Sequence, residues 1–173
     1  MGGAQKQIEA IAETLNGLSL HQEFASTPQE RLDLWHTRSN LSAACSSFLG
    51  HKLSEDMAIP LCSLQEFAQW FKDQEHKPHL LSGLFGHAGD GNLHVQIMFD
   101  DKKHTAEAQN LRHNLLLKVL SLGGTLSAEH GIGLQKKSYL PLEQSKALID
   151  VQKRIKKAFD PYNLLNPGKI FDI

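Results

Sequence analysis

The chain has few cysteines, no long apolar run and no N-terminal targeting pattern. Its 173 residues include two cysteines, Cys45 and Cys62, without a CxxC spacing. We therefore expect two free thiols in a reducing compartment rather than a disulfide framework. No window approaches the ~20 apolar residues that a membrane span needs. The first residues lack a basic segment followed by an apolar one, which argues against a secretory signal peptide. These absences together indicate a cytoplasmic protein.

The charges nearly cancel, because 18 lysines and arginines stand against 19 aspartates and glutamates, for a net charge of −1. A nucleic-acid or anionic-membrane partner is therefore not expected. The sequence also lacks a GxGxxG run or another glycine loop that cradles phosphate. It contains no repeat and no low-complexity linker, and its apolar content of 40% is sufficient for one core. We predict a single compact domain over residues 1–173.

Apolar spacing predicts helices that alternate with strands. Thr27, Pro28 and Glu30 have the order of a helix cap, a first-turn proline and a first-turn acid, and Ser63 can cap a later helix. Trp35 lies at helical spacing and is expected in the core. The predicted helices cover residues 4–16, 28–44, 63–71, 105–121 and 142–159, and the predicted strands cover residues 18–24, 57–59, 80–85 and 93–99. This order indicates the α+β class, with an antiparallel sheet and helices on one face.

A glycine-rich turn carries two of the histidines. The run from Gly86 to His94 places His87 and His94 seven positions apart, directly before an apolar, strand-like segment. The glycines permit positive φ and close backbone approach, so both imidazoles can fold back toward one point. The acid and amide side chains between the histidines are expected to brace the turn. Gln96 lies two positions after His94 on the predicted strand and therefore shares its face.

A second cluster, in residues 127–133, supplies Glu129 directly before His130. Two histidines and a glutamate form the ligand set of an open catalytic metal site, which makes His87, His94 and Glu129 candidate metal ligands. His130 then remains for proton transfer. The glycines around this cluster allow an irregular loop in which both Glu129 and His130 can serve one site. The two clusters together indicate the active-site half of an enzyme.

Two other classes of protein fit the same residues. A self-contained metal hydrolase could use these histidines, with a metal-activated water and either Glu129 or His130 as the base. A non-catalytic binding or assembly module would use the histidines only to brace the turn, and it would hold no stoichiometric metal. The seven remaining histidines are expected at the surface or in packing: His21, His36, His51, His76, His79, His104 and His113.

Five motifs run in a fixed order over nearly the whole chain. They are Leu34–Arg38, Lys52–Pro60, Gly86–His94, Gly123–Gly133 and Asp160–Lys169. In this order they resemble the C-terminal domain of the FAD-linked 2-hydroxyacid dehydrogenases, a family within the vanillyl-alcohol-oxidase superfamily. That family includes D-lactate dehydrogenase, the flavin subunit of glycolate oxidase and D-2-hydroxyglutarate dehydrogenase.

The resemblance implies a two-domain flavoenzyme in which residues 1–173 form the substrate-binding cap domain, with a ferredoxin-like α+β core. An N-terminal domain, absent from this chain, would hold the FAD. Such an enzyme oxidises a D-2-hydroxy acid, such as lactate or glycolate, to the 2-oxo acid and passes hydride to the flavin. The chain alone is then expected to be inactive. The electron acceptor is not identified by the sequence, and it could hold the enzyme peripherally at the inner membrane.

The resemblance also assigns roles to the histidine clusters. His87, His94 and Glu129 would hold a divalent metal, zinc or manganese, that polarises the substrate hydroxyl. His130 would remove the hydroxyl proton as the general base.

The substrate and the flavin would meet further residues. Arg38 would bind the substrate carboxylate through its guanidinium, and Lys52 would add a second positive charge. Ser42 stands where some relatives carry threonine and retains a hydroxyl. Gln96 would line the pocket. Two residues of the last motif would lie near the flavin: Asn166 and Lys169.

Overall fold

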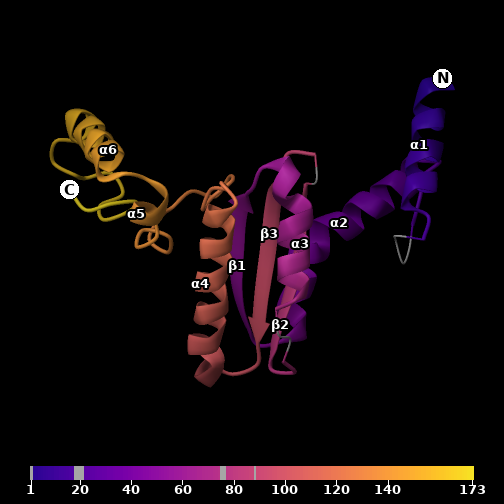
Figure 1. Ribbon diagram of the computed structural model, residues 1–173, viewed down its shortest axis with the longest axis horizontal. Coiled ribbons are helices and arrows are strands. Elements are labelled where there is room, and N and C mark those ends of the chain that lie inside the picture. Colours follow the sequence, from indigo (N-terminus) through magenta and orange to yellow (C-terminus); the bar gives the residue numbers. More distant parts are fainter. Residues whose placement is uncertain (1, 18–21, 75–76, 88) are drawn as a thin grey trace. The chain divides into compact units, whose positions relative to one another are not determined.

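The computed structural model describes residues 2–17, 22–74, 77–87 and 89–173 (Figure 1). Its internal contacts divide the chain into two compact units, Met1–Leu41 and Ser42–Ile173. The single domain over residues 1–173 stays a prediction. Both thiols are free, as the sequence predicted, with Cys45 half-buried and Cys62 exposed. No helix in the described ranges is long and apolar enough to cross a membrane.

The first unit contains α1 (Gly2–Leu15) and most of α2 (Pro28–Phe48), and both predicted helices are confirmed. The cap of α2 is also confirmed, because the backbone N–H of Glu30 donates to Thr27 Oγ1 at 3.2 Å and the Glu30 carboxylate accepts from the Thr27 N–H at 3.0 Å. The strand predicted over residues 18–24 is wrong where it can be tested, since residues 22–26 are irregular and residues 18–21 lie outside the described ranges. Trp35 is 58% exposed, so its expected place in the core is wrong.

The second unit is built on a three-stranded antiparallel sheet of β1 (His51–Ala58), β2 (Leu80–His87) and β3 (Asn92–Phe99) in the order β1-β3-β2. Helix α3 (Leu64–Lys72) joins β1 to β2, and α4 (Thr105–Ser121) follows β3. The α+β class is therefore confirmed. The element order is that of a ferredoxin-like fold in which the fourth strand is reduced to one bridge, between Thr125 and Ala58. The strand predicted over residues 57–59 is corrected to the longer β1.

The two faces of the sheet have different neighbours. The side chains of Leu93, Val95, Ile97 and Phe99 lie on one face of β3 and share one core cluster with residues of both α3 and α4. The helical members of that cluster are Phe67, Phe71, Ala108, Leu115 and Val119. The opposite face carries the cross-strand partners Asp56, His94 and Phe85, and next to them Gln96. Strand register thus places the predicted site residues His94 and Gln96 on the face that α3 and α4 leave uncovered.

The last part of the chain contains α5 (Leu140–Glu143) and α6 (Lys146–Phe159). The helix predicted over residues 142–159 is confirmed over residues 146–159 and wrong at its start, because Gln144 is extended and Ser145 begins α6 by accepting a hydrogen bond from the Leu148 N–H. Ser63, by contrast, makes no side-chain cap bond to α3. It ends a short 3-10 helix, Leu61–Ser63, that precedes α3.

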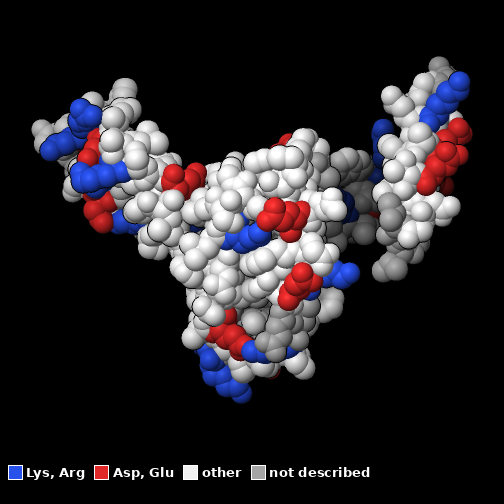
Figure 2. Space-filling view, viewed as in Figure 1, with Lys and Arg blue, Asp and Glu red and all other residues white. Residues whose placement is uncertain are grey.

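Charged side chains of opposite sign are interspersed over the surface. On the face of Figure 2, acidic and basic groups lie beside one another rather than in separate patches. The contacts of Lys118 with Glu66 at 2.6 Å and of Lys146 with Asp150 at 2.5 Å are examples of such pairs. Exposed pairs of this kind contribute little to stability, so the fold depends mainly on the core and on buried polar contacts.

We expect Gly91→Ala to destabilise the second unit by about 2–4 kcal/mol. Gly91 has a φ of +75°, and a methyl group there would lie 2.1 Å from the Ile59 carbonyl oxygen. The same approach brings the Ile59 N–H to 3.0 Å from the Gly91 carbonyl oxygen. Urea-induced unfolding followed by circular dichroism measures the effect. Gly83→Ala is the matched control, because Gly83 lies in the same hairpin and a methyl group there meets no atom within 4 Å; equal losses in the two variants would contradict the prediction.

Candidate active site

The turn between β2 and β3 brings two predicted site residues together. The His87 carbonyl oxygen accepts hydrogen bonds from the N–H groups of Asp90 at 3.2 Å and Gly91 at 3.1 Å. The Asp90 carboxylate accepts from the Asn92 N–H at 3.0 Å, which confirms that the acid braces the turn. The imidazole rings of His87 and His94 consequently lie with their centroids 6.0 Å apart and their planes 79° to each other.

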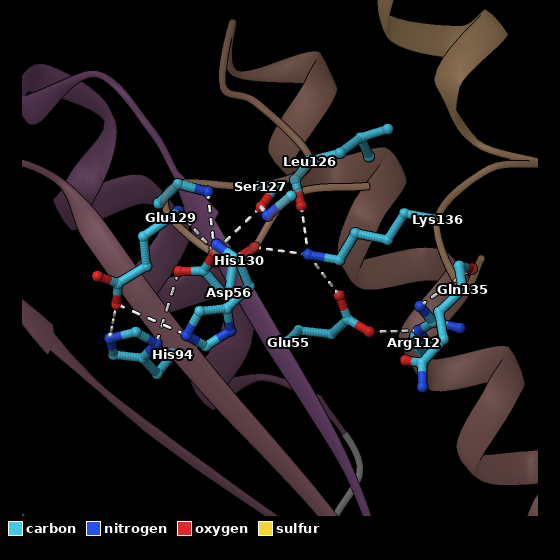
Figure 3. A network of polar contacts seen from close by, with 12 residues as sticks. Glu55, Asp56, His94, Arg112, Leu126, Ser127, Glu129, His130, Gln135 and Lys136 are labelled. Carbon is cyan, nitrogen blue, oxygen red and sulfur yellow. Dashed lines mark hydrogen bonds and ion pairs between the residues drawn. The ribbon is translucent and has the colours of Figure 1, made fainter. Parts of the chain in front are cut away.

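The loop that carries Glu129 and His130 is anchored by a residue to which the sequence analysis assigned no role. Asp56, on β1, has a side chain that is 1% exposed. Its Oδ2 atom accepts four hydrogen bonds from the loop (Figure 3): from Ser127 Oγ at 3.2 Å and from the N–H groups of Ala128 at 3.0 Å, Glu129 at 2.8 Å and His130 at 2.9 Å. Several backbone N–H groups that point at one oxygen form a concave anion site. Here the anion belongs to the protein, and it fixes the backbone from which both functional side chains project.

Asp56 remains ionised in this environment. Burial by itself would raise the pKa of its carboxyl group, but the N–H groups of His130 and Glu129 stabilise the carboxylate and hold the pKa below the ordinary value of 3.8. The nearby His130 imidazole and the Ser127 hydroxyl act in the same direction. The anchor is therefore a charged acceptor at neutral pH.

A second buried contact holds the far end of the loop. The Lys136 ammonium donates to the carbonyl oxygens of Asp56, at 2.6 Å, and Leu126. It also lies 3.1 Å from Glu55 Oε2, while the other Glu55 oxygen accepts from Arg112 Nε (Figure 3). The neighbours Glu55 and Asp56 point to opposite faces of β1, so consecutive residues of one strand hold the two ends of the loop.

Three side chains converge over the open face of the sheet. Glu129 Oε1 lies 3.6 Å from His94 Nε2 and 3.8 Å from His130 Nε2 (Figure 3). The ring centroids of His94 and His130 are 6.0 Å apart, and the ring planes are inclined by 28°. The side chain of His94 is 15% exposed, whereas those of Glu129 and His130 are 56% and 66% exposed. A ligand can therefore reach the carboxylate and the His130 imidazole from solvent.

The donor atoms of this cluster suit a divalent metal. Two ligands of a tetrahedral zinc ion lie about 3.3 Å apart, close to the 3.6 Å between Glu129 Oε1 and His94 Nε2. Asp56 Oδ1 is buried, has no hydrogen-bond donor among the described residues and lies 3.7 Å from His94 Nδ1. A small rotation of the ring would bring Nδ1 within hydrogen-bond distance of this acceptor, which would then hold the Nδ1 proton and leave Nε2 to bind a metal. Ligand atoms of Asp56, Glu129 and His130 also lie within 4.8 Å of one another, and this group includes neither His87 nor His94.

Three of the predicted substrate-binding residues have polar partners within the second unit. Lys52 Nζ donates to the Ser42 carbonyl oxygen at 2.9 Å and lies 3.4 Å from the Ser42 hydroxyl. Gln96 is 4% exposed, and its side-chain oxygen accepts from Ser54 Oγ at 2.7 Å. The structure therefore brings Lys52 and Ser42 together and fixes the side chain of Gln96.

The other predicted residues lie in separate surroundings. Arg38 belongs to the first unit, where its guanidinium carbon lies 5.9 Å from the centre of the Trp35 ring. Asn166 and Lys169 occupy an exposed turn near the C-terminus, in which Lys169 Nζ donates to Asn166 Oδ1 at 3.0 Å. Asn166 has a φ of 50°, so its backbone adopts the left-handed conformation in this turn. The roles of all three residues stay predictions.

We expect Asp56→Asn to destabilise the chain by about 2–4 kcal/mol, because the loop N–H groups lose an ionised acceptor and an amide N–H₂ enters a site lined by donors. Chemical denaturation at neutral pH measures the loss. Asp73→Asn is the matched control, since the exposed Asp73 carboxylate accepts a hydrogen bond from Gln69 one helical turn earlier. A similar loss in the two variants would show that Asp56 is not an anchor.

The pH dependence of stability tests the same contact. Because the folded chain holds the pKa of Asp56 below 3.8, the stability that its charge supplies is complete above the unfolded-state pKa and is lost as pH falls through the folded-state pKa. The wild type should therefore lose more stability than Asp56→Asn on acidification below about pH 4. Other carboxylates with lowered pKa values, including Glu107 and Asp160, both at about 2, are common to both proteins and cancel in the difference.

Comparison with known sequences identifies the family of this chain. The sequence model described as "FAD linked oxidases, C-terminal domain" matches residues 2–170. Mitochondrial D-lactate dehydrogenase (cytochrome) of Arabidopsis thaliana is 36% identical over 167 residues, which cover 94% of this chain and 29% of the relative.

Two further relatives have other names. Glycolate oxidase subunit GlcD of Bacillus subtilis is 33% identical, over 96% of this chain and 35% of its own length. D-2-hydroxyglutarate dehydrogenase of Stutzerimonas stutzeri is 31% identical, over 90% of this chain and 34% of its own length. The chain thus spans between 29% and 35% of the length of these three relatives. It belongs to the family of FAD-linked oxidase C-terminal domains.

Proposed function

We propose that the chain is the substrate- and metal-binding part of a flavin-dependent dehydrogenase that oxidises a D-2-hydroxy acid to the 2-oxo acid. Such an oxidation removes a hydride from the α-carbon of the substrate, which bound FAD would accept, and a proton from the substrate hydroxyl, which a base of the protein would accept. The FAD would be held by a second domain of the same polypeptide. The observation that carries the proposal is the convergence of His94, Glu129 and His130 on the open face of the sheet, in a chain of this family.

His130 is the proposed general base. Its imidazole is two-thirds exposed, lies beside the Glu129 carboxylate and projects from a backbone that Asp56 holds in place. A base must reach the proton that it removes, so it has to be both accessible and fixed in position.

His87, His94 and Glu129 are the residues that we propose to hold the divalent metal, zinc or manganese. When bound, such an ion polarises the substrate hydroxyl and lowers its pKa. Asp56 orients His94 from the other side of the ring, as a carboxylate partner of a metal-binding histidine commonly does. The same carboxylate therefore positions His94 through one oxygen and the loop of Glu129 through the other.

The substrate carboxylate needs positive charge and hydrogen-bond donors. We propose Arg38 and Lys52 as the cations and Ser42 as a hydroxyl donor, and Lys52 and Ser42 already lie together. Gln96, fixed by Ser54 on the sheet face that carries His94, would contact the side chain of the substrate and influence which acid fits. Two residues of the C-terminal turn would approach the flavin: Asn166 and Lys169.

The FAD that a second domain would hold needs a further electron acceptor. One relative is named a cytochrome-linked D-lactate dehydrogenase, and we propose a protein electron acceptor here as well. Contact with such a partner could hold the full enzyme at the inner membrane.

We expect His94→Ala to remove about one equivalent of zinc or manganese from protein that is purified without chelators. The physical reason is that the substitution deletes one ligand of three and opens the site. Elemental mass spectrometry of the wild type and the variant measures the metal content. His51→Ala is the matched control, because His51 lies on the neighbouring strand, where it stacks on Phe99.

The outcomes separate the proposed classes of protein. Metal lost from His94→Ala but retained in His51→Ala supports the site, whereas identical metal contents contradict it and favour an assembly module. Ester or amide hydrolysis by the wild-type chain without flavin would favour a metal hydrolase.

We expect His130→Gln to lower kcat for D-2-hydroxy acids by about 10²–10⁴ in a polypeptide that carries both this chain and a FAD-binding domain. Bleaching of the flavin absorbance after mixing with D-lactate, glycolate or D-2-hydroxyglutarate measures the reductive step directly. Glutamine cannot accept the proton, but it retains a hydrogen-bonding side chain. The exposed His113 provides the control His113→Gln, and unchanged flavin reduction in His130→Gln would refute the assignment of the base.

A further inference from the structure

Two histidines and a glutamate also meet at the end of the sheet that is remote from the candidate active site. His79 directly precedes β2, His104 ends the short 3-10 helix Lys102–His104, and Glu107 lies in the first turn of α4. One ligand atom from each of the three lies within 4.8 Å of the other two. The seven residue steps of β2 from Leu80 to His87 correspond to about 23 Å, so this cluster is distinct from the first one.

Both imidazoles of the cluster approach the same carboxylate oxygen of Glu107. Glu107 Oε2 lies 3.0 Å from His79 Nε2 and 3.7 Å from His104 Nδ1. These separations are on either side of the about 3.3 Å expected between two ligands of a tetrahedral zinc ion. The two imidazole rings are stacked, with centroids 4.0 Å apart and planes 27° to each other. Small rotations of the side chains are therefore sufficient to point all three donors at one ion.

A helix start and a tight turn hold the three residues in place. His104 and Glu107 are three positions apart and therefore share one face at the start of α4, while His79 lies in the tight turn closed by the Lys77–Leu80 bridge. Side-chain exposures of 31% for His79, 21% for His104 and 32% for Glu107 leave all three side chains accessible to an ion and to water from solvent.

The surroundings also suit an ion at this position. Asp100 Oδ1 lies 3.6 Å from His104 Nε2, where it can hold the proton of the ring nitrogen that does not face Glu107. Lys77 Nζ lies 2.5 Å from Glu107 Oε1, which leaves Oε2 on the side of the two rings.

We propose that His79, His104 and Glu107 form a second divalent transition-metal site that binds zinc, with water as the fourth ligand. Two imidazoles and one carboxylate are the ligand set of many zinc sites that keep one open position. The ion would link the start of β2 to the start of α4 and stabilise the folded chain by binding it in preference to the unfolded chain.

Zinc titration of the His94→Ala protein, in competition with a chromophoric chelator at about pH 7.5, where histidine is mostly neutral, tests the proposal. The His94→Ala background weakens the proposed catalytic site, so the remaining zinc reports on the new one. We expect one equivalent to bind in this background. Adding His79→Ala or His104→Ala should weaken that binding by more than the about 10- to 100-fold that the loss of an outer-shell partner causes. Cobalt in place of zinc reports the tetrahedral geometry through its visible absorption.

Two further variants make the outcome decisive. Glu107→Gln retains the size of the side chain but removes its charge, so it should weaken zinc binding by at least about tenfold. His113→Ala replaces another histidine of α4 and should leave binding unchanged. Absence of zinc binding below millimolar concentration in the His94→Ala background, or binding that withstands the His79 and His104 substitutions, overturns the proposal. If a histidine variant fails to fold, as judged by circular dichroism, Glu107→Gln decides: retained affinity overturns the site and weakened affinity supports it.

Discussion

The candidate active site depends on the contact between the Asp56 carboxylate and the backbone of residues 128–130. The loop there has no regular structure of its own, so the directions of the Glu129 and His130 side chains follow from where their N–H groups are held. One buried oxygen accepts three of those N–H groups and the Ser127 hydroxyl. A charged acceptor strengthens each of these bonds and makes their joint loss expensive. The other oxygen of the same carboxylate faces His94, so the Asp56 side chain lies between the strand residue His94 and the loop of Glu129 and His130.

The sheet supplies the second constraint, because it has one apolar and one polar face. The odd-numbered residues of β3 belong to the core that α3 and α4 complete, and the even-numbered residues therefore project toward the site. Pairing in register then brings Asp56 beside His94 and Ser54 beside Gln96. The chemistry of the site is thus a consequence of strand alternation, to which the turn and the loop add the remaining groups.

Much of the fold could be predicted from local patterns, and the errors have physical causes. The helices 4–16 and 105–121 and the strands 80–85 and 93–99 have clear periodicity, and the structure contains all four. Most of β1 was missed because Lys52, Glu55 and Asp56 make the segment read as a polar loop. Glu55 and Asp56 are in fact buried, with partners from distant parts of the chain. Such pairings depend on tertiary contacts, which a sequence pattern of period two does not contain.

In the candidate site, too, local patterns could be predicted and tertiary contacts could not. Glycine spacing and adjacent ligand-type residues were enough to single out His87, His94, Glu129 and His130. Of these, the structure brings the imidazoles of His94 and His130 within 4 Å of the Glu129 carboxylate. The role of Asp56 could not be read from its neighbours, because all its partners in the loop are more than 70 positions away. His79 and His104 looked like ordinary surface histidines for the same reason, since their meeting depends on where β2 begins and α4 starts.

The opposite orientations of Glu55 and Asp56 have a consequence for how the sheet forms. If β1 slipped by one residue against β3, Asp56 would turn toward the helices and Glu55 toward the open face. Arg112 and Lys136 would then lose their buried counter-ion, and the N–H groups of residues 128–130 would lose their acceptor. Uncompensated buried charges and donors each cost several kcal/mol, so the shifted pairing is strongly disfavoured. The pair of carboxylates that holds the loop therefore also acts as a lock on strand register, and it selects one alignment of β1 during folding.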